Sequence, residues 1–139
     1  MPTIYFLSEG IKFIPKNKNK LRVWISDVIT LENREISSLV YIFCQDSFLL
    51  TINHDYLNHK TFTDIVTFDY SDGRVIDGEI YISVERVKEN ATKFQTTFEE
   101  ELHRVMIHGV LHLLGFNDKT PYQKSRMRKK EEACLSLRN

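Results

Sequence analysis

Residues 105–118 read Val-Met-Ile-His-Gly-Val-Leu-His-Leu-Leu-Gly-Phe-Asn-Asp. From Val105 to Leu114 this run is apolar apart from His108, His112 and one glycine. A helix that is apolar on all sides is normally central in a domain and covered by other elements. Because a buried polar group without a partner costs on the order of 1–3 kcal/mol, two imidazoles on such a helix need partners.

A divalent metal ion would satisfy both histidines. His108 and His112 are four residues apart, so they lie on one face of the helix and can converge on one ion. Gly115 suits the left-handed position that ends a helix, and Asp118 can then return as a third ligand. Three protein ligands leave a tetrahedral position open for water, as in catalytic zinc sites. We therefore predict one zinc ion per chain, held by His108, His112 and Asp118.

Two other interpretations of the histidines are open. They can be core residues that donate to backbone carbonyls or buried carboxylates, although the apolar surroundings, the glycine and the nearby aspartate favour the metal. The second interpretation is a metallopeptidase. In the common metalloprotease pattern the residue after the first histidine is a glutamate that acts as general base, but this chain has Gly109 there, which disfavours a peptidase. His103 points elsewhere on the helix and is expected not to be a ligand.

The composition is that of one globular domain spanning residues 1–139. The chain has 139 residues, with 42% hydrophobic and 27% charged residues, and its 19 Lys+Arg balance 19 Asp+Glu. No apolar run reaches the ~18 residues that a membrane span needs, and no secretory signal is recognisable. Cys44 and Cys134 follow no disulfide or metal pattern, which favours a reducing compartment. We expect a cytoplasmic protein.

The rest of the sequence predicts a mixture of strands and helices. Period-two or β-rich runs predict strands at 3–7, 39–44, 65–70 and 79–84, and extended backbone at 11–14. Helical spacing or capping residues predict helices around 21–29, from 46 to about 57, from 97 to 115 and from 120 to about 137. About four strands and four or five helices in mixed order predict an α+β fold, with the histidine helix central on a mixed sheet.

The histidine run resembles the signature of the YbeY family of rRNA-maturation endoribonucleases, H-G-x-L-H-L-x-G-[YF]-D-H. Seven positions match in register: His108, Gly109, Leu111, His112, Leu113, Gly115 and Phe116. Upstream, 57–58, 63–68 and 78–83 resemble the two blocks that precede the histidine helix in the family. The resemblance implies a metal-dependent endoribonuclease, specific for single strands, that acts at the 3′ end of 16S rRNA and in ribosome quality control.

The chain departs from the family pattern in two places. The third metal histidine of the family falls at position 118, which is Asp118 here, and Asn117 occupies the family's aspartate position. The family also carries an arginine, thought to engage RNA phosphate, shortly before the Thr63–Asp64 block. Here Lys60 is the nearest substitute and His59 the second choice. A lysine carries a single point charge and cannot form the two parallel hydrogen bonds that an arginine makes to a phosphate.

Basic residues follow the predicted metal site. Between Lys119 and Lys130 there are six Lys or Arg and no acidic residue, so this run could hold an RNA backbone or simply form a solvated helix face. Arg104 lies one turn before His108 and could reach a scissile phosphate. Alternatively, Arg104 forms a surface ion pair with Glu100, four residues earlier on the helix.

The leading hypothesis is a zinc-dependent endoribonuclease. His108, His112 and Asp118 would hold the ion that activates water, and Lys60 or Arg104 would offset developing phosphate charge. Its partners would be rRNA and the small ribosomal subunit, with no DNA and no membrane. The rival is a non-catalytic ribosome-assembly factor that binds rRNA and whose metal is structural or absent. That rival predicts a fourth protein ligand closing the site.

Overall fold

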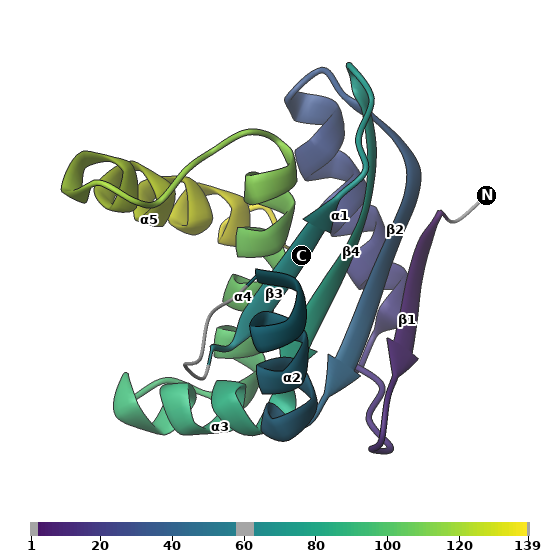
Figure 1. Cartoon of the computed structure of the whole chain (residues 1–139). Coiled ribbons are helices and arrows are strands. Elements are labelled where there is room, and N and C mark those ends of the chain that lie inside the picture. The colour runs from purple at the N-terminus through teal and green to yellow at the C-terminus, as the bar shows by residue number, and fades with distance from the viewer. Residues whose placement is uncertain (1–2, 58–62, 139) are drawn as a thin grey trace.

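A four-stranded mixed sheet forms the centre of the computed structural model, which describes residues 3–57 and 63–138. The strands are β1 (Ile4–Ser8), β2 (Glu35–Cys44), β3 (Ile65–Asp69) and β4 (Val75–Ser83). They lie in the order β1-β2-β4-β3, with β1, β2 and β4 parallel and β3 antiparallel to β4 (Figure 1). Tyr41 pairs with Phe6 on one side and with Ile80 on the other.

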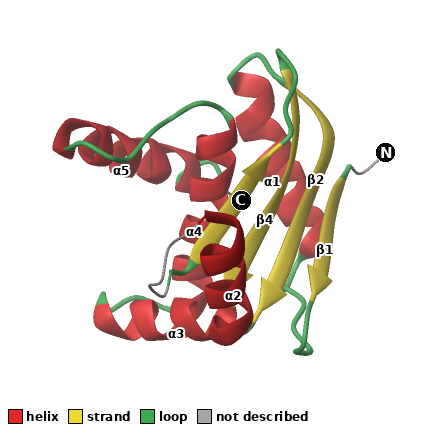
Figure 2. Ribbon diagram, in the orientation of Figure 1, coloured by secondary structure: helices red, strands yellow, loops and turns green. Residues whose placement is uncertain are grey.

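Five helices surround the sheet within the described ranges. They are α1 (Lys18–Leu31), α2 (Asp46–Leu57), α3 (Val84–Lys93), α4 (Phe98–Leu113) and α5 (Pro121–Leu135). Helices α1 and α4 pack on one face, and α2 covers part of the other (Figure 2). The predicted α+β fold with a mixed sheet is therefore confirmed. None of the described helices is both long and apolar enough to cross a membrane.

The sheet has a hydrophobic core on each of its two faces, because the side chains of each strand alternate between the faces. On β2, Leu39, Tyr41 and Phe43 enter the main core with α1, α4 and α5, whereas Cys44 joins Leu49 of α2 on the opposite face. Successive side chains of a strand point to opposite faces, so one strand can serve both cores. The main core is the larger of the two, and it is the one that holds α4 in place.

Two segments outside the predicted strands and helices complete the fold. Residues 11–14, expected to be extended, belong to no strand of the sheet; Gly10 before them has a φ of 74°, and Ile11 and Phe13 pack against the main core. The sequence reasoning missed α3. Its signals were present, since the Ser83 hydroxyl accepts from the Arg86 N–H as an N-cap and Val84, Val87 and Ala91 are buried at helical spacing.

Gly109 allows α4 to lie close to the sheet. A Cβ at this position would come 2.8 Å from Ile80 Cδ1 and 3.0 Å from Ile65 Cδ1, closer than packed carbon atoms tolerate. Both isoleucines belong to or pack against the main core. The close approach brings the histidine-bearing helix directly over β3 and β4.

Gly109→Val is therefore expected to lower the free energy of unfolding by about 2–3 kcal/mol through overpacking. Ser125→Val, on an exposed position of α5, is the control for placing a β-branched residue in a helix and should cost less than about 1 kcal/mol. Urea unfolding followed by circular dichroism measures both. Equal losses in the two variants would show that α4 has more room over the sheet than this packing implies.

Candidate metal centre

Helix α4 places His108 and His112 on one partly open face. Its N-terminus is capped by Thr97, whose hydroxyl accepts from the Glu100 N–H at 3.0 Å, as the capping spacing predicted. The neighbours Met106, Ile107, Val110 and Leu111 are fully buried, but the side chains of His108 and His112 remain 20% and 30% exposed. The helix is central, as expected, yet it is not covered on all sides, because the histidine face borders a cavity.

The chain reverses after α4 through a Schellman motif. The Gly115 N–H donates to the His112 carbonyl at 3.0 Å, and the Phe116 N–H donates to the Leu111 carbonyl at 3.0 Å. Gly115 has a φ of 100°, a conformation that favours glycine. This reversal returns Asp118 to the histidines, as predicted from the position of Gly115 at the end of the helix.

Three potential ligand atoms meet at the end of this reversal. The distances are 3.0 Å between the Nε2 atoms of His108 and His112, 3.2 Å from His108 Nε2 to Asp118 Oδ2, and 3.5 Å from His112 Nε2 to the same oxygen. Ligands bound at 2.0–2.1 Å to a tetrahedral ion are about 3.3 Å from one another. The nitrogen and oxygen donors and their spacing therefore fit a zinc ion. Among the described residues, these three form the whole cluster of this kind.

A fourth residue, Glu131 of α5, supports the cluster from behind. Its Oε2 lies 2.6 Å from His108 Nδ1, the ring nitrogen that faces away from the cluster, and its side chain is only 8% exposed. A carboxylate on the outer nitrogen of a ligating histidine fixes the orientation of the ring and its tautomer. Sequence reasoning missed Glu131, because nothing in the sequence distinguishes it from the adjacent Glu132.

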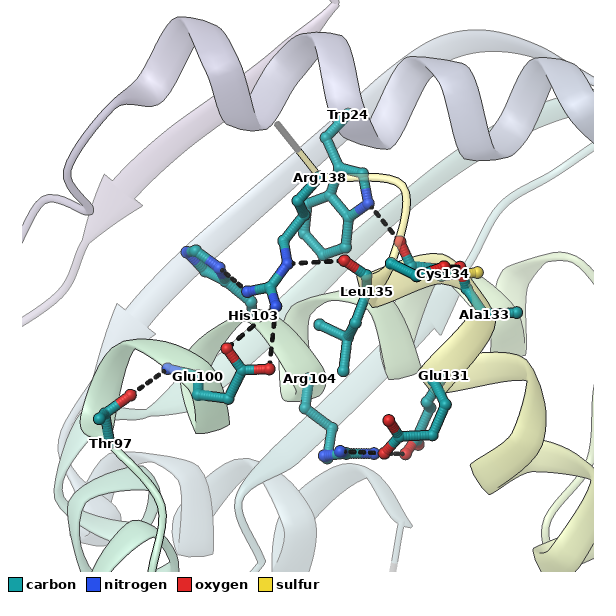
Figure 3. A network of polar contacts seen from close by, with 12 residues as sticks. Trp24, Thr97, Glu100, His103, Arg104, Glu131, Ala133, Cys134, Leu135 and Arg138 are labelled. Carbon is teal, nitrogen blue, oxygen red and sulfur yellow. Dashed lines mark hydrogen bonds and ion pairs between the residues drawn. The ribbon is translucent and has the colours of Figure 1, made fainter.

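Contacts at the C-terminal end of α5 hold this helix against α4 and α1 (Figure 3). The Trp24 indole N–H donates to the Cys134 carbonyl at 2.8 Å. The Arg138 guanidinium donates to both carboxylate oxygens of Glu100 at 2.9 Å and lies 2.7 Å from His103 Nδ1. His103 therefore belongs to this anchor and not to the cluster, as its position on the helix predicted.

Arg104 has different partners from the one expected. The predicted alternative, an ion pair with Glu100, is wrong, because Arg138 occupies Glu100. Arg104 instead donates to Glu131 at 3.0 Å (Figure 3). It also pairs with Glu132. Its charge is thus partly neutralised, and part of its role is to hold the Glu131 carboxylate that contacts His108.

A cavity of about 490 Å³ opens beside the cluster. Its walls include His108, Asp118, Arg104, Arg128 and Asp64. Within residues 3–57 and 63–138, Arg128 forms no ion pair or hydrogen bond, so it is the less engaged of the two arginines there. Lys60, the other predicted cation, lies outside the described residues.

Burial shifts the ionisation of the carboxyl groups in this cavity. Burial is the main cause that raises the pKa of Asp64, and it likewise raises the pKa of Glu101, which lines the same cavity. A carboxyl group with a raised pKa exchanges its proton closer to neutral pH, as proton-transfer groups require.

The two cluster histidines shift in opposite directions. Burial disfavours the charged form of His108, but the hydrogen bond and charge of Glu131 outweigh it and raise the pKa above its usual value. Burial, followed by the charge of His108, lowers the pKa of His112. His112 thus keeps the neutral ring that ligates metals, and a bound cation would displace the proton of His108.

The two cysteines take no part in this site. Both are buried and free, and burial together with nearby acidic groups raises the pKa of Cys44 to about 12. A thiol with this pKa stays protonated and is neither a nucleophile nor a ready metal ligand.

Comparison with known families agrees with this site. The family model described as "Endoribonuclease YbeY" matches residues 8–138 of the chain. A protein of that name from Flavobacterium psychrophilum is 55% identical over 114 residues, which cover 82% of this chain and 81% of that protein. Another from Cytophaga hutchinsonii is 45% identical over 137 residues, 98% of this chain and 96% of that protein.

A solved structure has the same fold. The solution structure of TM1509 from Thermotoga maritima superposes with a TM-score of 0.67 at 27% identity, covering 96% of this chain and 87% of that one. The superposition therefore includes nearly all of the chain, the histidine helix and α5 among it. The fold, the family match and the arrangement of the three donor atoms all indicate the same class of protein.

Proposed function

The chain belongs to the YbeY endoribonuclease family, and on that premise we propose that it is a zinc-dependent endoribonuclease that matures 16S rRNA. Its substrate would be unpaired RNA of the small ribosomal subunit, near the 3′ end of the 16S molecule. The protein would act as one domain spanning residues 1–139, in the cytoplasm. A single main core that joins three strands with α1, α4 and α5 supports the one-domain proposal.

The observation that carries the proposal is the triangle of donor atoms from His108, His112 and Asp118, with edges of 3.0, 3.2 and 3.5 Å. In this proposal those residues are the metal ligands. A zinc ion held there would supply a Lewis acid and lower the pKa of a bound water molecule. The carboxylate at 118, where the family pattern has a histidine, keeps an atom of suitable chemistry in the third position.

The remaining residues orient the ligands and the substrate. Glu131 holds the His108 ring, and Arg104 holds Glu131. Arg128 reaches the same cavity without an ion pair among the described residues, so it is the cation best suited to an RNA phosphate, together with Lys60. Arg104 lines the same cavity, and its positive charge, which is paired with Glu131 and Glu132, would help to offset charge developing on the phosphate.

The alternative is a non-catalytic assembly factor whose metal is structural or absent, and its form with a structural metal predicts a fourth protein ligand. Within the part of the chain that the structure describes, the cluster has three members. Glu131 faces the outer nitrogen of His108, on the side away from the other two donor atoms. This arrangement is typical of an open, catalytic site and favours the enzyme.

Incubation of the zinc-loaded protein with a single-stranded RNA that carries the 16S 3′ end tests the proposal. We expect cleavage that a chelator abolishes, and cleavage at least about tenfold slower when a complementary strand pairs the same segment. A sequencing gel measures the products. Tight RNA binding without any cleavage by the zinc-loaded protein would overturn the enzyme proposal in favour of the assembly factor.

A further inference from the structure

A second cavity, of about 400 Å³, lies where the loop after α4 meets the first turns of α5. It shares no lining residue with the cavity beside the histidines. Asn117 is part of its wall, and the next residue is Asp118, so the two cavities flank the same short loop. Its volume is within the range of small-molecule sites.

Flat side chains form the walls of this second cavity. Tyr122 is 74% exposed, the highest value among the large hydrophobic residues whose burial the structure describes, and Arg126 lies four residues further on the same face of α5. The guanidinium carbon of Arg126 lies 5.2 Å from the centre of the Phe116 ring, so the aromatic ring supports the cation. Phe116 is itself half-buried against the main core, so its ring is held in place beneath Arg126.

The charge of the second cavity differs from that of the first. No Asp or Glu is among its lining residues, whereas Asp64, Glu101, Asp118 and Glu131 line the cavity beside the histidines. Within the described ranges, Arg126 forms no ion pair, and its contact is with Phe116. Exposed aromatic rings and guanidinium planes without carboxylates are the groups on which proteins stack unpaired bases next to a phosphate.

We infer that this cavity is a nucleobase subsite, in which Tyr122 and Arg126 stack one unpaired base of the RNA next to the cleaved bond. The inference rests on the proposed function, because it places the RNA strand across the loop that carries Asp118. A base in a duplex cannot be turned out into such a cavity without breaking its pair. The subsite would therefore contribute to the preference for single strands.

Abasic scanning of a cleaved RNA tests the subsite. A set of single-stranded RNAs, each with one base removed at successive positions around the cleavage point, is offered to the zinc-loaded protein, and kcat/KM is measured for each. Loss of one base near the cleavage point should lower kcat/KM about tenfold, mainly through KM. Tyr122→Ala should lower kcat/KM of the intact RNA by a similar factor and lose its sensitivity to that abasic position.

Two further variants separate stacking from other effects. Tyr122→Phe keeps the ring and should behave as the native protein, whereas Tyr5→Ala removes an exposed tyrosine from β1 and should change nothing. Unchanged abasic sensitivity in Tyr122→Ala, in a native protein that does cleave RNA, would overturn the subsite and leave the proposed function standing. A native protein that does not cleave RNA would overturn both.

Discussion

Replacement of His112 by alanine is expected to reduce RNA cleavage below detection while the protein stays folded. The variant removes the donor atom that lies 3.0 Å from His108 Nε2 and 3.5 Å from Asp118 Oδ2, so only two ligands remain. Two ligands do not hold zinc in the three-ligand arrangement of a catalytic site. The His112 side chain is 30% exposed, so its removal leaves no closed cavity in the core and little stability is lost.

His103→Ala is the matched control for this variant. It removes a histidine from the same helix, but one that contacts Arg138 and the Trp24 ring and lies outside the cluster. We expect it to retain cleavage close to the native rate. Circular dichroism establishes that both variants are folded, and a gel assay with single-stranded RNA measures their rates. Cleavage by folded His112→Ala at the native rate would remove the metal cluster from the mechanism.

The second large effect is expected at Glu131, on zinc affinity. Glu131→Ala removes the carboxylate that lies 2.6 Å from His108 Nδ1, so the ring loses the partner that sets its orientation. The loss of such a partner typically weakens metal binding 10–100-fold, and we expect a fall of about that size. Glu131→Gln keeps an acceptor oxygen without the charge and should recover part of the affinity. Competition with a zinc-binding fluorescent indicator measures the dissociation constants.

The adjacent glutamate provides the control. Glu132 pairs with the same arginine, Arg104, but its side chain is 58% exposed and it contacts neither cluster histidine. Glu132→Ala should therefore leave zinc affinity within about twofold of the native value. If Glu131→Ala and Glu132→Ala weaken zinc binding equally, the effect comes from loss of the Arg104 ion pairs and not from orientation of His108.

The fold was predictable wherever local signals agreed with one another. For α4, the apolar run, the capping threonine and the glycine stop predicted a helix from 97 to 115, and the structure has Phe98–Leu113 followed by the Schellman motif. The pattern at 11–14 predicted extended backbone and did not show whether the segment joins the sheet, because alternating apolar residues also fit a segment that packs on the core without a strand partner. An alternating apolar pattern indicates which side chains are buried. It does not show whether the backbone bonds to a neighbouring strand, because that depends on the rest of the fold.

The candidate site was predictable where its members are close in sequence. His108 and His112 are brought together by helix geometry, and Asp118 by the reversal after Gly115, so all three depend on local signals. Glu131 is 23 residues from His108, and only the packing of α5 on α4 places it there. The partner of Arg104 was wrong for the same reason. The i, i+4 rule pointed to Glu100, which a residue 38 positions away occupies instead.

The measurement that tests the metal centre most directly is zinc content per chain by elemental mass spectrometry. It is made on the native protein and on His112→Ala, both purified without chelator. The arrangement of His108, His112 and Asp118 predicts about one zinc ion per native chain and its loss in the variant. No metal in the native protein, or equal metal in both proteins, would contradict the assignment of these three residues as ligands.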